Sequence, residues 1–461
     1  MHNTTYFAFY NDENWGQFLH FKIFYSPHII WAMKLIIHRG DKEIGGSCIE
    51  IRSNSGASIF IDAGLELYGE KATLPKEIEN TDAVFLSHAH PDHFGLLGGV
   101  PPNIPMYCGE ITESILQIMI AFNGDKFDKI DRKFLHFKSG EEVKIKDISI
   151  TPFLTDHSVP DSYAFLVKAD GKTVFYSGDF RTGGRKHHCI TRILNAVKKP
   201  NILIADCTCI EPREGSIKTE EELAEKITET ISANSNLPVF ALSSAINVDR
   251  IVTFYKAARR NKRIFVCDIY TALILWAIGR SGAKVPQITW ECVKVLSRDD
   301  IAKSQRVLLE LFFKELGFQD FRDIIYRKNA SITAEEISKN PHKYLLKLNR
   351  VRDLQKACGI GKFVLIYSMW SGYLSSEFDK QGNYKDLMDD PNVIFKILHT
   401  GGHSASKDIK RFIGGLAPEF LLPFHTNSQD YIIAHKDELF GDFSCPPRLI
   451  TELNENELNV L

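Results

Sequence analysis

The sequence lacks any stretch of about eighteen uncharged apolar residues, the length that a membrane-spanning helix needs, so we expect no membrane span. Its formal net charge of −2 argues against a uniformly basic nucleic-acid-binding surface, and any such contact would need a local patch. The nine cysteines have no regular spacing, and residues 1–32 have neither the basic start nor the apolar run of a signal peptide. We therefore expect buried thiols in a reducing, cytoplasmic setting.

The length of the chain indicates more than one structural unit. With 461 residues it exceeds one ordinary core, which predicts two domains or one domain with a large insertion. Hydrophobic residues at 44% and charged residues at 25% are typical of a globular protein. Residues 1–32 are expected to be an N-terminal extension, either non-native or an additional packed element, and we assign them no role.

The most informative segment of the sequence is residues 85–94. A short apolar run that ends at Leu86 is predicted to be a buried strand, and it is followed at once by His88, His90, Asp92 and His93. Imidazole and carboxylate are ligands that Zn²⁺ prefers. Two histidines at alternate positions can share one metal ion, while the two side chains beyond the bend at Pro91 can reach a second. The segment therefore predicts a metal site.

Three more polar residues follow predicted strands between residues 33 and 206. Asp62, His157 and Asp179 each stand at the end of a short apolar, β-branched run. Each of them alone would more often be a turn former or another structural residue. A carboxylate such as Asp179 can bridge two cations, which a neutral imidazole cannot do, and we therefore assign it as a bridging ligand.

The H-x-H-x-D-H pattern at residues 88–93 resembles the metallo-β-lactamase superfamily. That resemblance implies an αββα sandwich in which Asp62 orients a ligand histidine, and metal-bound imidazoles need such partners. His157 and Asp179 complete the superfamily's third and fourth motifs.

A long insertion separates these motifs from the last histidine of the pattern. Residues 201–206 read as another buried strand that ends in Asp206, and the next candidate ligand, His425, comes some two hundred residues later. The stretch between them alternates short strands with helices, which predicts a parallel α/β unit, and residues 299–358 are expected to be mostly helical. Asp206, His403 and His425 look like the three motifs of the β-CASP nucleases, whose second domain is inserted between the first two of those motifs.

Further phrases resemble the ribonuclease J group of that family, among them residues 157–162, 176–180 and 243–250. Residues 367–373 depart from it, because the group usually has a Gly-Ser-Gln-Gly-Glu-like phrase there. The resemblance implies an α/β protein, a metallo-β-lactamase αββα sandwich with an inserted α/β β-CASP domain. The expected divisions are the extension 1–32, the first part of the metallo-β-lactamase domain 33–208, the inserted domain 209–392 and the second part 393–461.

The family's roles imply two Zn²⁺ ions that share Asp179. The first ion would be bound by His88, His90, His157 and Asp179, and the second by Asp92, His93, His425 and Asp179. Mn²⁺ is possible, although it normally prefers more oxygen ligands.

Three residues have roles in the reaction by the same resemblance. Asp92 belongs to the catalytic residues as well as to the ligands. His403 would stabilise the scissile phosphate or protonate the leaving oxygen. Asp206 would support a ligand histidine from behind.

Candidate phosphate contacts lie before two predicted helices. Gly402, Ser404 and Ser406 precede a helix expected over residues 407–413, whose free N–H groups favour an anion. Ser243 and Ser244 follow a predicted strand and could contribute from the inserted domain. The alternative is that these serines simply cap their helices, which is at least as common for serine.

The resulting hypothesis is a two-zinc ribonuclease acting on RNA, more readily on single strands, as a 5′-exonuclease, an endonuclease or both. The preference for RNA depends on His425, since β-CASP proteins of RNA processing have His there and those of DNA repair usually Val. The alternatives are a β-CASP DNA nuclease and a catalytically silent RNA-binding scaffold of the same fold. The cleavage mode and the oligomeric state stay open.

Overall fold

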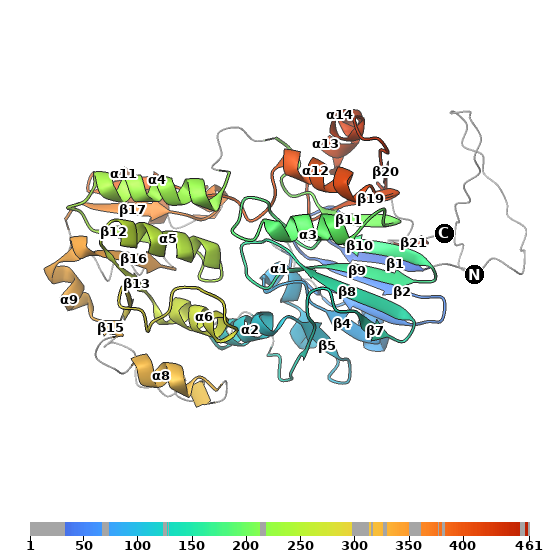
Figure 1. Ribbon diagram of the computed structural model, residues 1–461, viewed down its shortest axis with the longest axis horizontal. Coiled ribbons are helices and arrows are strands. Elements are labelled where there is room, and N and C mark those ends of the chain that lie inside the picture. Colours follow the sequence, from blue (N-terminus) through green and yellow to red (C-terminus); the bar gives the residue numbers. More distant parts are fainter. Residues whose placement is uncertain are drawn as a thin grey trace, which may run out of the picture.

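In a computed structural model of the chain, the described residues form three seven-stranded sheets in two lobes (Figure 1). The structure describes residues 33–66, 73–122, 127, 129–212, 218–296, 313–314, 317–325, 330–349, 361–376, 378–379, 383–451 and 457–459. The expected extension 1–32 lies outside this range. Among the described residues, no helix has both the length and the apolar character needed to cross a membrane.

The first sheet begins with antiparallel strands and continues with parallel ones. The pairs β1–β2 and β2–β3 are antiparallel, whereas β3 to β6 are parallel to each other. In spatial order its strands are β21 (Glu457–Asn459), β1 (Lys34–Arg39), β2 (Cys48–Arg52), β3 (Ser58–Ile61), β4 (Ala83–Phe85), β5 (Met106–Cys108) and β6 (Leu135–His136).

The second sheet packs face to face against the first. Its strands β7 to β10 are antiparallel, and β11, β19 and β20 continue it in parallel with β10. Apolar side chains of both sheets form one shared buried cluster, which includes Ile49, Phe85 and Phe165. The strands in spatial order are β20 (Arg448–Leu449), β19 (Phe420–Phe424), β11 (Ile202–Asp206), β10 (Lys172–Tyr176), β9 (Tyr163–Ala169), β8 (Ile148–Leu154) and β7 (Val143–Ile145).

Helices cover the outer faces of both sheets (Figure 1). The amphipathic helix α2 (Glu110–Phe122) packs its buried face, with Ile115 and Ile118, into the core outside the first sheet. Outside the second sheet lie α3 (His188–Ala196), α12 (Ser406–Leu416), α13 (Gln429–Ala434) and α14 (Lys436–Phe440). This arrangement confirms the predicted αββα sandwich.

The inserted domain is built on a third sheet whose strands are all parallel. Its order is β15 (Ser331–Ile332), β14 (Val293–Leu296), β13 (Ile264–Cys267), β16 (Tyr344–Leu348), β12 (Val239–Leu242), β17 (Phe363–Tyr367) and β18 (Val393–Ile397). Its helices are α4 (Glu220–Ala233), α5 (Val248–Arg260), α6 (Ile269–Arg280), α8 (Gln319–Ile325), α9 (Ala334–Lys339) and α11 (Asn383–Asp389). The predicted parallel α/β unit is present.

One expectation for this part of the chain was incomplete and another was wrong. Where they are described, residues 299–358 are largely helical, as expected, but they also contain β16, which runs through the middle of the sheet between β13 and β12. Four of the five residues of β16 are apolar, and such a short run fits a strand as well as a buried helix, so only its neighbours decide. Strand β18 was assigned to the second part of the metallo-β-lactamase domain, but it pairs along its whole length with β17. The third sheet therefore extends to Ile397.

Contacts between the described parts of the two lobes include the following two. Helix α2 of the sandwich lies beside α6 of the inserted domain (Figure 1), and the rings of Phe122 and Tyr270 are 5.1 Å apart. The second place is the start of α4, where the N–H of Glu220 donates to the carbonyl of Gly183 over 2.9 Å. Helix α4 begins where the sequence predicts, since the hydroxyl of Thr219 accepts from the N–H of Glu222.

Candidate metal centre

The candidate ligands converge because each follows a strand of the sandwich. Strand β4 leads into His88 and His90, and Pro91 then opens the short helix α1 (Pro91–Phe94), which carries Asp92 and His93. His157 follows β8, Asp179 follows β10 and His425 follows β19. His88, His93 and His157 are fully buried, and Asp179 and His425 nearly so.

Four side chains form the first set of ligand atoms: His88, His90, His157 and Asp179. The Nδ1 atom of His90 lies 3.0 Å from His88 Nε2 and 3.1 Å from His157 Nε2. The Oδ2 atom of Asp179 lies 3.6 Å from His88 Nε2 and 3.7 Å from His157 Nε2. A tetrahedral zinc ion with bonds of about 2.0–2.1 Å would separate its ligand atoms by about 3.3–3.4 Å. The observed distances lie on both sides of that value.

The second set is Asp92, His93 and His425, and it shares the same oxygen of Asp179. Asp179 Oδ2 lies 3.4 Å from His93 Nε2 and 3.9 Å from His425 Nε2. Asp92 Oδ2 lies 3.1 Å from His425 Nε2 and 4.0 Å from His93 Nε2. His93 Nε2 is buried and has no hydrogen-bond partner, which is costly for a polar atom unless something binds it. The residues present therefore fit a divalent cation in each set.

The buried carboxylate of Asp62 fixes the orientation of His93. Its Oδ2 accepts a hydrogen bond from His93 Nδ1 at 2.8 Å and another from the Tyr176 hydroxyl at 2.9 Å. The N–H and hydroxyl of Ser87 also donate to Asp62, and His88 Nδ1 lies 3.0 Å from the Ser87 oxygen. These contacts occupy the Nδ1 atoms and leave the Nε2 atoms of both histidines for a metal.

Asp206 supports His403 directly and His425 through an intermediate hydroxyl. His403 Nδ1 donates to Asp206 Oδ2 over 2.8 Å. The hydroxyl of Thr208 donates to Asp206 Oδ1 over 2.6 Å and lies 2.9 Å from His425 Nδ1. Sequence reasoning assigned Asp206 to a ligand histidine and missed Thr208, which stands two residues further on and could have been noticed as a hydroxyl beside the motif.

His403 lies at the edge of the two sets. One of its ring nitrogens is within 4.8 Å of ligand atoms of Asp179 and His425, and its ring is 5.4 Å from that of His157. Burial by itself would lower the pKa of His403, but the carboxylates of Asp206 and Asp179 outweigh burial and raise the pKa to about 10. The two carboxylates therefore favour the protonated form of His403 beside the centre.

The ligand histidines differ in the direction of their pKa shifts. Burial lowers the pKa of His88, His90 and His157, that of His90 to about 4, so these imidazoles are neutral at pH 7. Neutral imidazole is the form that binds a metal. Burial also acts to lower the pKa of His93, but Asp179 and Asp62 raise it well above its ordinary value.

The predicted phosphate contacts lie in different surroundings. The carbonyl of Gly402 accepts a hydrogen bond from His157 Nδ1 at 2.7 Å, so this residue orients a candidate ligand. The buried Ser404 hydroxyl has no hydrogen-bond partner, and its N–H donates to the carbonyl of Phe180. Helix α12 starts at Ser406, and its N-cap residue is Ala405. Neither serine is therefore the N-cap of that helix.

Ser243 and Ser244 follow β12, as the sequence predicts. The hydroxyl of Ser243 is buried and donates to the carbonyl of Ser244 over 3.3 Å, whereas Ser244 is exposed. The N-cap of the following helix α5 is Asn247, whose side chain accepts from the N–H of Arg250. The alternative that these two serines cap the helix is wrong, because the cap lies three residues beyond Ser244.

A buried network of charges joins the metal-binding loops to the inserted domain. Arg181, two residues after Asp179, contacts the carboxylates of Asp156, Glu220 and Asp249. Asp156 directly precedes His157, whereas Glu220 and Asp249 belong to the inserted domain. Sequence reasoning missed this network, because none of its pairs is close in the sequence.

Arg250 extends the network to the loop that carries His403. Its guanidinium group donates to Glu220 over 2.9 Å, to the Ser368 carbonyl over 3.0 Å and to the Thr400 carbonyl over 3.0 Å. Its Nη1 also lies 3.1 Å from His399 Nδ1. Burial and this guanidinium group lower the pKa of His399 to about 3.

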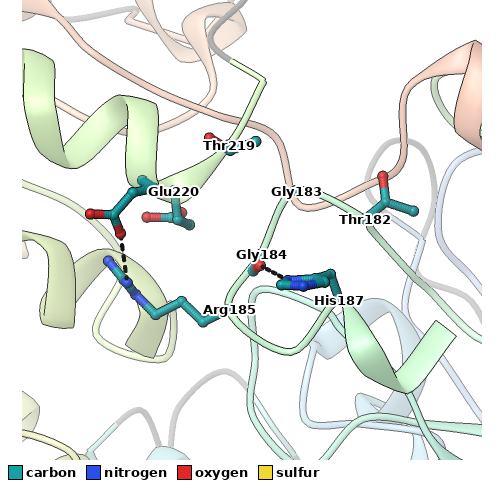
Figure 2. A pocket seen from close by; sticks show the side chains of 8 residues that line it. Thr182, Gly183, Gly184, Arg185, His187, Thr219 and Glu220 are labelled. Carbon is teal, nitrogen blue, oxygen red and sulfur yellow. Dashed lines mark hydrogen bonds and ion pairs between the residues drawn. The ribbon is translucent and has the colours of Figure 1, made fainter. Parts of the chain in front are cut away.

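A pocket of about 350 Å³ opens at the same junction. Figure 2 shows it between the loop of residues 182–187 and the first turn of α4, with Arg185 directed toward α4 and the His187 ring toward the Gly184 carbonyl. None of the candidate metal ligands is among the residues that line it.

Comparisons with known proteins agree with this geometry. Residues 58–239 match the family model of the "Beta-lactamase superfamily domain". The chain is 22% identical over 411 residues to ribonuclease J of Sinorhizobium meliloti, a match that covers 82% of this chain and 65% of that protein. It is 26% identical over 458 residues to ribonuclease J 2 of Streptococcus pyogenes, covering 93% and 76% respectively.

A solved structure shares the fold. The crystal structure of a protein of unknown function from Enterococcus faecalis superposes with a TM-score of 0.71 at 19% identity, covering 93% of this chain and 99% of that one. The resemblance predicted from the sequence is confirmed. This chain carries a metallo-β-lactamase superfamily domain and is similar over most of its length to ribonucleases J.

Proposed function

We propose that this protein is a two-zinc ribonuclease that hydrolyses phosphodiester bonds of RNA. The observation that carries the proposal is the single buried oxygen, Oδ2 of Asp179, which faces ring nitrogens of both ligand sets at 3.4–3.9 Å. Two cations that share one carboxylate are the arrangement of many phosphodiesterases. Proteins named ribonuclease J are among the relatives of this chain, which supports RNA as the substrate.

The ligand assignment follows the two sets. His88, His90 and His157 would hold one ion, and Asp92, His93 and His425 the other, with Asp179 between them. Five imidazoles and two carboxylates supply the ligand atoms, a balance that favours Zn²⁺ over Mn²⁺. Two bound cations would supply Lewis acidity, which lowers the pKa of water and neutralises the charge of a phosphate.

His403 provides the protein's own contribution to the reaction. Asp206 holds its Nδ1 atom and so fixes the direction of the ring, while a ring nitrogen stays within 4.8 Å of Asp179 and His425. A protonated imidazole in that position stabilises negative charge on the phosphate and can donate a proton to the leaving oxygen. Asp206 is thus a positioning residue for His403 and, through Thr208, for His425.

The substrate is proposed to be single-stranded RNA in the cytoplasm. His425 stands where RNA-processing members of the β-CASP family have histidine. The candidate contacts of the RNA phosphates are Ser243, Ser244, Ser404 and Ser406. The described cysteines are all free thiols, which supports a reducing compartment. The buried and unpartnered hydroxyl of Ser404 is the best placed of the serines to accept a further hydrogen-bond partner.

The test is metal-dependent cleavage of an end-labelled RNA that bears either a 5′-monophosphate or a 5′-hydroxyl, beside the matching DNA. Asp92→Ala and His403→Ala should abolish cleavage, whereas His342→Ala, at an exposed histidine of the inserted domain, should not change it. Elemental analysis should find two zinc ions per chain. Released mononucleotides would mean a 5′-exonuclease and internal products an endonuclease.

Three results would contradict the proposal. Cleavage of DNA alone would indicate a DNA nuclease. Tight RNA binding by metal-loaded protein without any cleavage would indicate a scaffold. Cleavage that survives Asp92→Ala would place the active site elsewhere.

A further inference from the structure

Three large aromatic side chains lie together on the surface of the inserted domain: Trp370, Tyr373 and Phe378. Their exposed fractions are 43%, 44% and 36%. The ring centroids are 5.3 Å apart for Trp370 and Tyr373 and 5.7 Å apart for the other two pairs, and all three contacts are edge-to-face. Water-exposed rings in mutual contact form an apolar surface that folding alone does not require.

This aromatic cluster begins at the end of β17, on the edge of the third sheet that leads to the metal centre. Strands β12 and β17 are parallel, with Leu242 beside Tyr367, so residues 243–244 and 368–370 leave the sheet at the carboxyl ends of their strands. Strand β18 ends on that side of the sheet too and continues into the loop with Gly402, whose carbonyl contacts His157. Open parallel sheets bind ligands outside the carboxyl ends of their strands.

Ser368 ties the start of the cluster to the active-site loop. Its hydroxyl donates to the carbonyl of Leu398, and its carbonyl accepts from Arg250 Nη1 over 3.0 Å. Arg250 also holds the carbonyl of Thr400, three residues before His403. Trp370 stands two residues after Ser368, so the cluster begins next to the residues that contact this loop.

The indole of Trp370 lies against Gly372. A Cβ atom at Gly372 would lie 2.2–2.4 Å from three carbons of the indole six-membered ring, so glycine leaves room for the ring there. The Tyr367 hydroxyl donates to the Trp370 carbonyl over 2.9 Å and constrains the backbone at that point. A constrained backbone loses less conformational entropy when a ligand arrives.

We propose that Trp370, Tyr373 and Phe378 form a stacking platform for unpaired nucleobases of single-stranded RNA whose backbone enters the metal centre. The inference rests on the proposed function and adds the part of the substrate that this surface contacts. Every base offers an aromatic face, so stacking on such rings tolerates different sequences. Paired bases are covered by their neighbours, so the platform distinguishes single strands from duplexes.

The experiment compares Trp370→Leu, Tyr373→Leu and Phe378→Leu with Trp290→Leu as the matched control. Trp290 is similarly exposed at 38%, but it precedes β14 and so lies at the opposite, amino-terminal edge of the third sheet. Affinity for a 5′-labelled single-stranded RNA is measured in the Asp92→Ala background, which prevents cleavage. Thermal unfolding of each variant checks that it is folded.

Loss of Trp370 should weaken RNA binding about 5-fold to 150-fold, which is the effect of 1–3 kcal/mol of stacking per base. Trp370→Phe should restore most of the affinity, and Trp290→Leu should stay within twofold of the parent. Binding to the matching duplex should not respond to any of the four changes. The parent's fluorescence should be quenched by single-stranded RNA, and Trp370→Leu should lose that quenching.

Separate results identify which proposal fails. Each single variant with Asp92 restored should hydrolyse a small chromogenic phosphodiester at the parent's rate, since that substrate reaches only the metal centre. If Trp370→Leu in the Asp92→Ala background binds RNA as Asp92→Ala alone does, while the protein with Asp92 cleaves RNA, the platform is wrong and the ribonuclease stands. If Asp92→Ala does not bind RNA and the protein with Asp92 does not cleave it, the proposed function fails and the platform with it. A change of oligomeric state in Trp370→Leu without loss of RNA affinity would assign the cluster to self-association and overturn the platform.

Discussion

Replacing the buried Arg250 by methionine should destabilise the inserted domain and its junction with the sandwich. The guanidinium group is fully buried and bonds the Glu220 carboxylate, two backbone carbonyls and the Ser368 hydroxyl. Methionine fills a similar length with apolar atoms but supplies neither a charge nor a donor. The substitution therefore leaves the carboxylate of Glu220 buried without its nearest cation.

The size of the effect follows from what remains around Glu220. Removing one partner of a buried ion pair typically costs about 3–5 kcal/mol, because the other charge stays buried and uncompensated. Here the Thr253 hydroxyl still donates to Glu220 over 2.8 Å, and Arg181 Nη1 lies 3.5 Å away. We therefore expect a loss at the lower end, about 3 kcal/mol of the free energy of unfolding.

The assay is urea unfolding followed by tryptophan fluorescence and far-ultraviolet circular dichroism. Three of the five tryptophans, Trp276, Trp290 and Trp370, belong to the inserted domain, and replacing Trp15 and Trp31 by Phe in parent and variants makes the fluorescence report on that unit. Arg260→Met is the control, since Arg260 is exposed on the same helix and its ion pair with Glu221 spans 3.4 Å at the surface. That change should stay within about 0.5 kcal/mol.

A double variant decides whether the charge pair is the cause. Glu220→Gln combined with Arg250→Met removes both charges, and the loss of unfolding free energy in this double variant should be about 1–3 kcal/mol smaller than the sum of the two single losses. Two results would refute the reasoning: an Arg250→Met protein within about 1 kcal/mol of the parent, or strict additivity of the two single changes.

Three further predictions concern the metal centre and its surroundings. Gly64→Ala should reduce the bound zinc and lower the free energy of unfolding by more than about 2 kcal/mol, because its Cβ atom would lie 1.7 Å from the carbonyl oxygen of Asp92. Elemental analysis and thermal unfolding measure both effects, and Gly361→Ala, whose Cβ atom would meet no atom within 4 Å, is the control. Asp179→Asn should lose both ions rather than one, which metal analysis after dialysis measures, and retention of one full equivalent would contradict a shared ligand. His399 has a pKa of about 3 when folded and about 6.5 when unfolded, so its contribution to stability is present above pH 6.5 and is lost as the pH falls towards 3. Between pH 6.5 and 5 the free energy of unfolding should therefore fall by roughly 1.5 kcal/mol more in the parent than in His399→Gln. Urea titrations that find the same fall in both proteins would contradict this.

The sequence could predict the sandwich and the set of candidate ligands because both depend on local patterns. His88, His90, Asp92 and His93 lie within six residues after one apolar strand, and His157, Asp179 and His425 each follow another. Strand ends that belong to one sheet edge meet in space, so residues at those ends come together whatever the chain does between them. The structure brings these seven side chains together as the pattern predicts.

The inserted domain was harder to predict because its order depends on pairing across long stretches of chain. Strand β16 has four apolar residues among five, a pattern that fits a strand or a helix, and its central place in the sheet depends on β12 and β13. Strand β18 looked like part of the sandwich by its position in the sequence, but its partner is β17.

The sequence by itself determined which chemistry this protein can hold: the ligand types, their spacing and the insertion between Asp206 and His425. Only the tertiary structure decided which partner orients which ligand. Asp62, already expected to orient a ligand histidine, contacts His93; Thr208 lies between Asp206 and His425; and the Gly402 carbonyl accepts from His157. The physical reason is that a hydrogen bond depends on atoms meeting within about 3 Å, and residues up to 245 positions apart acquire that proximity only when the sheets have paired.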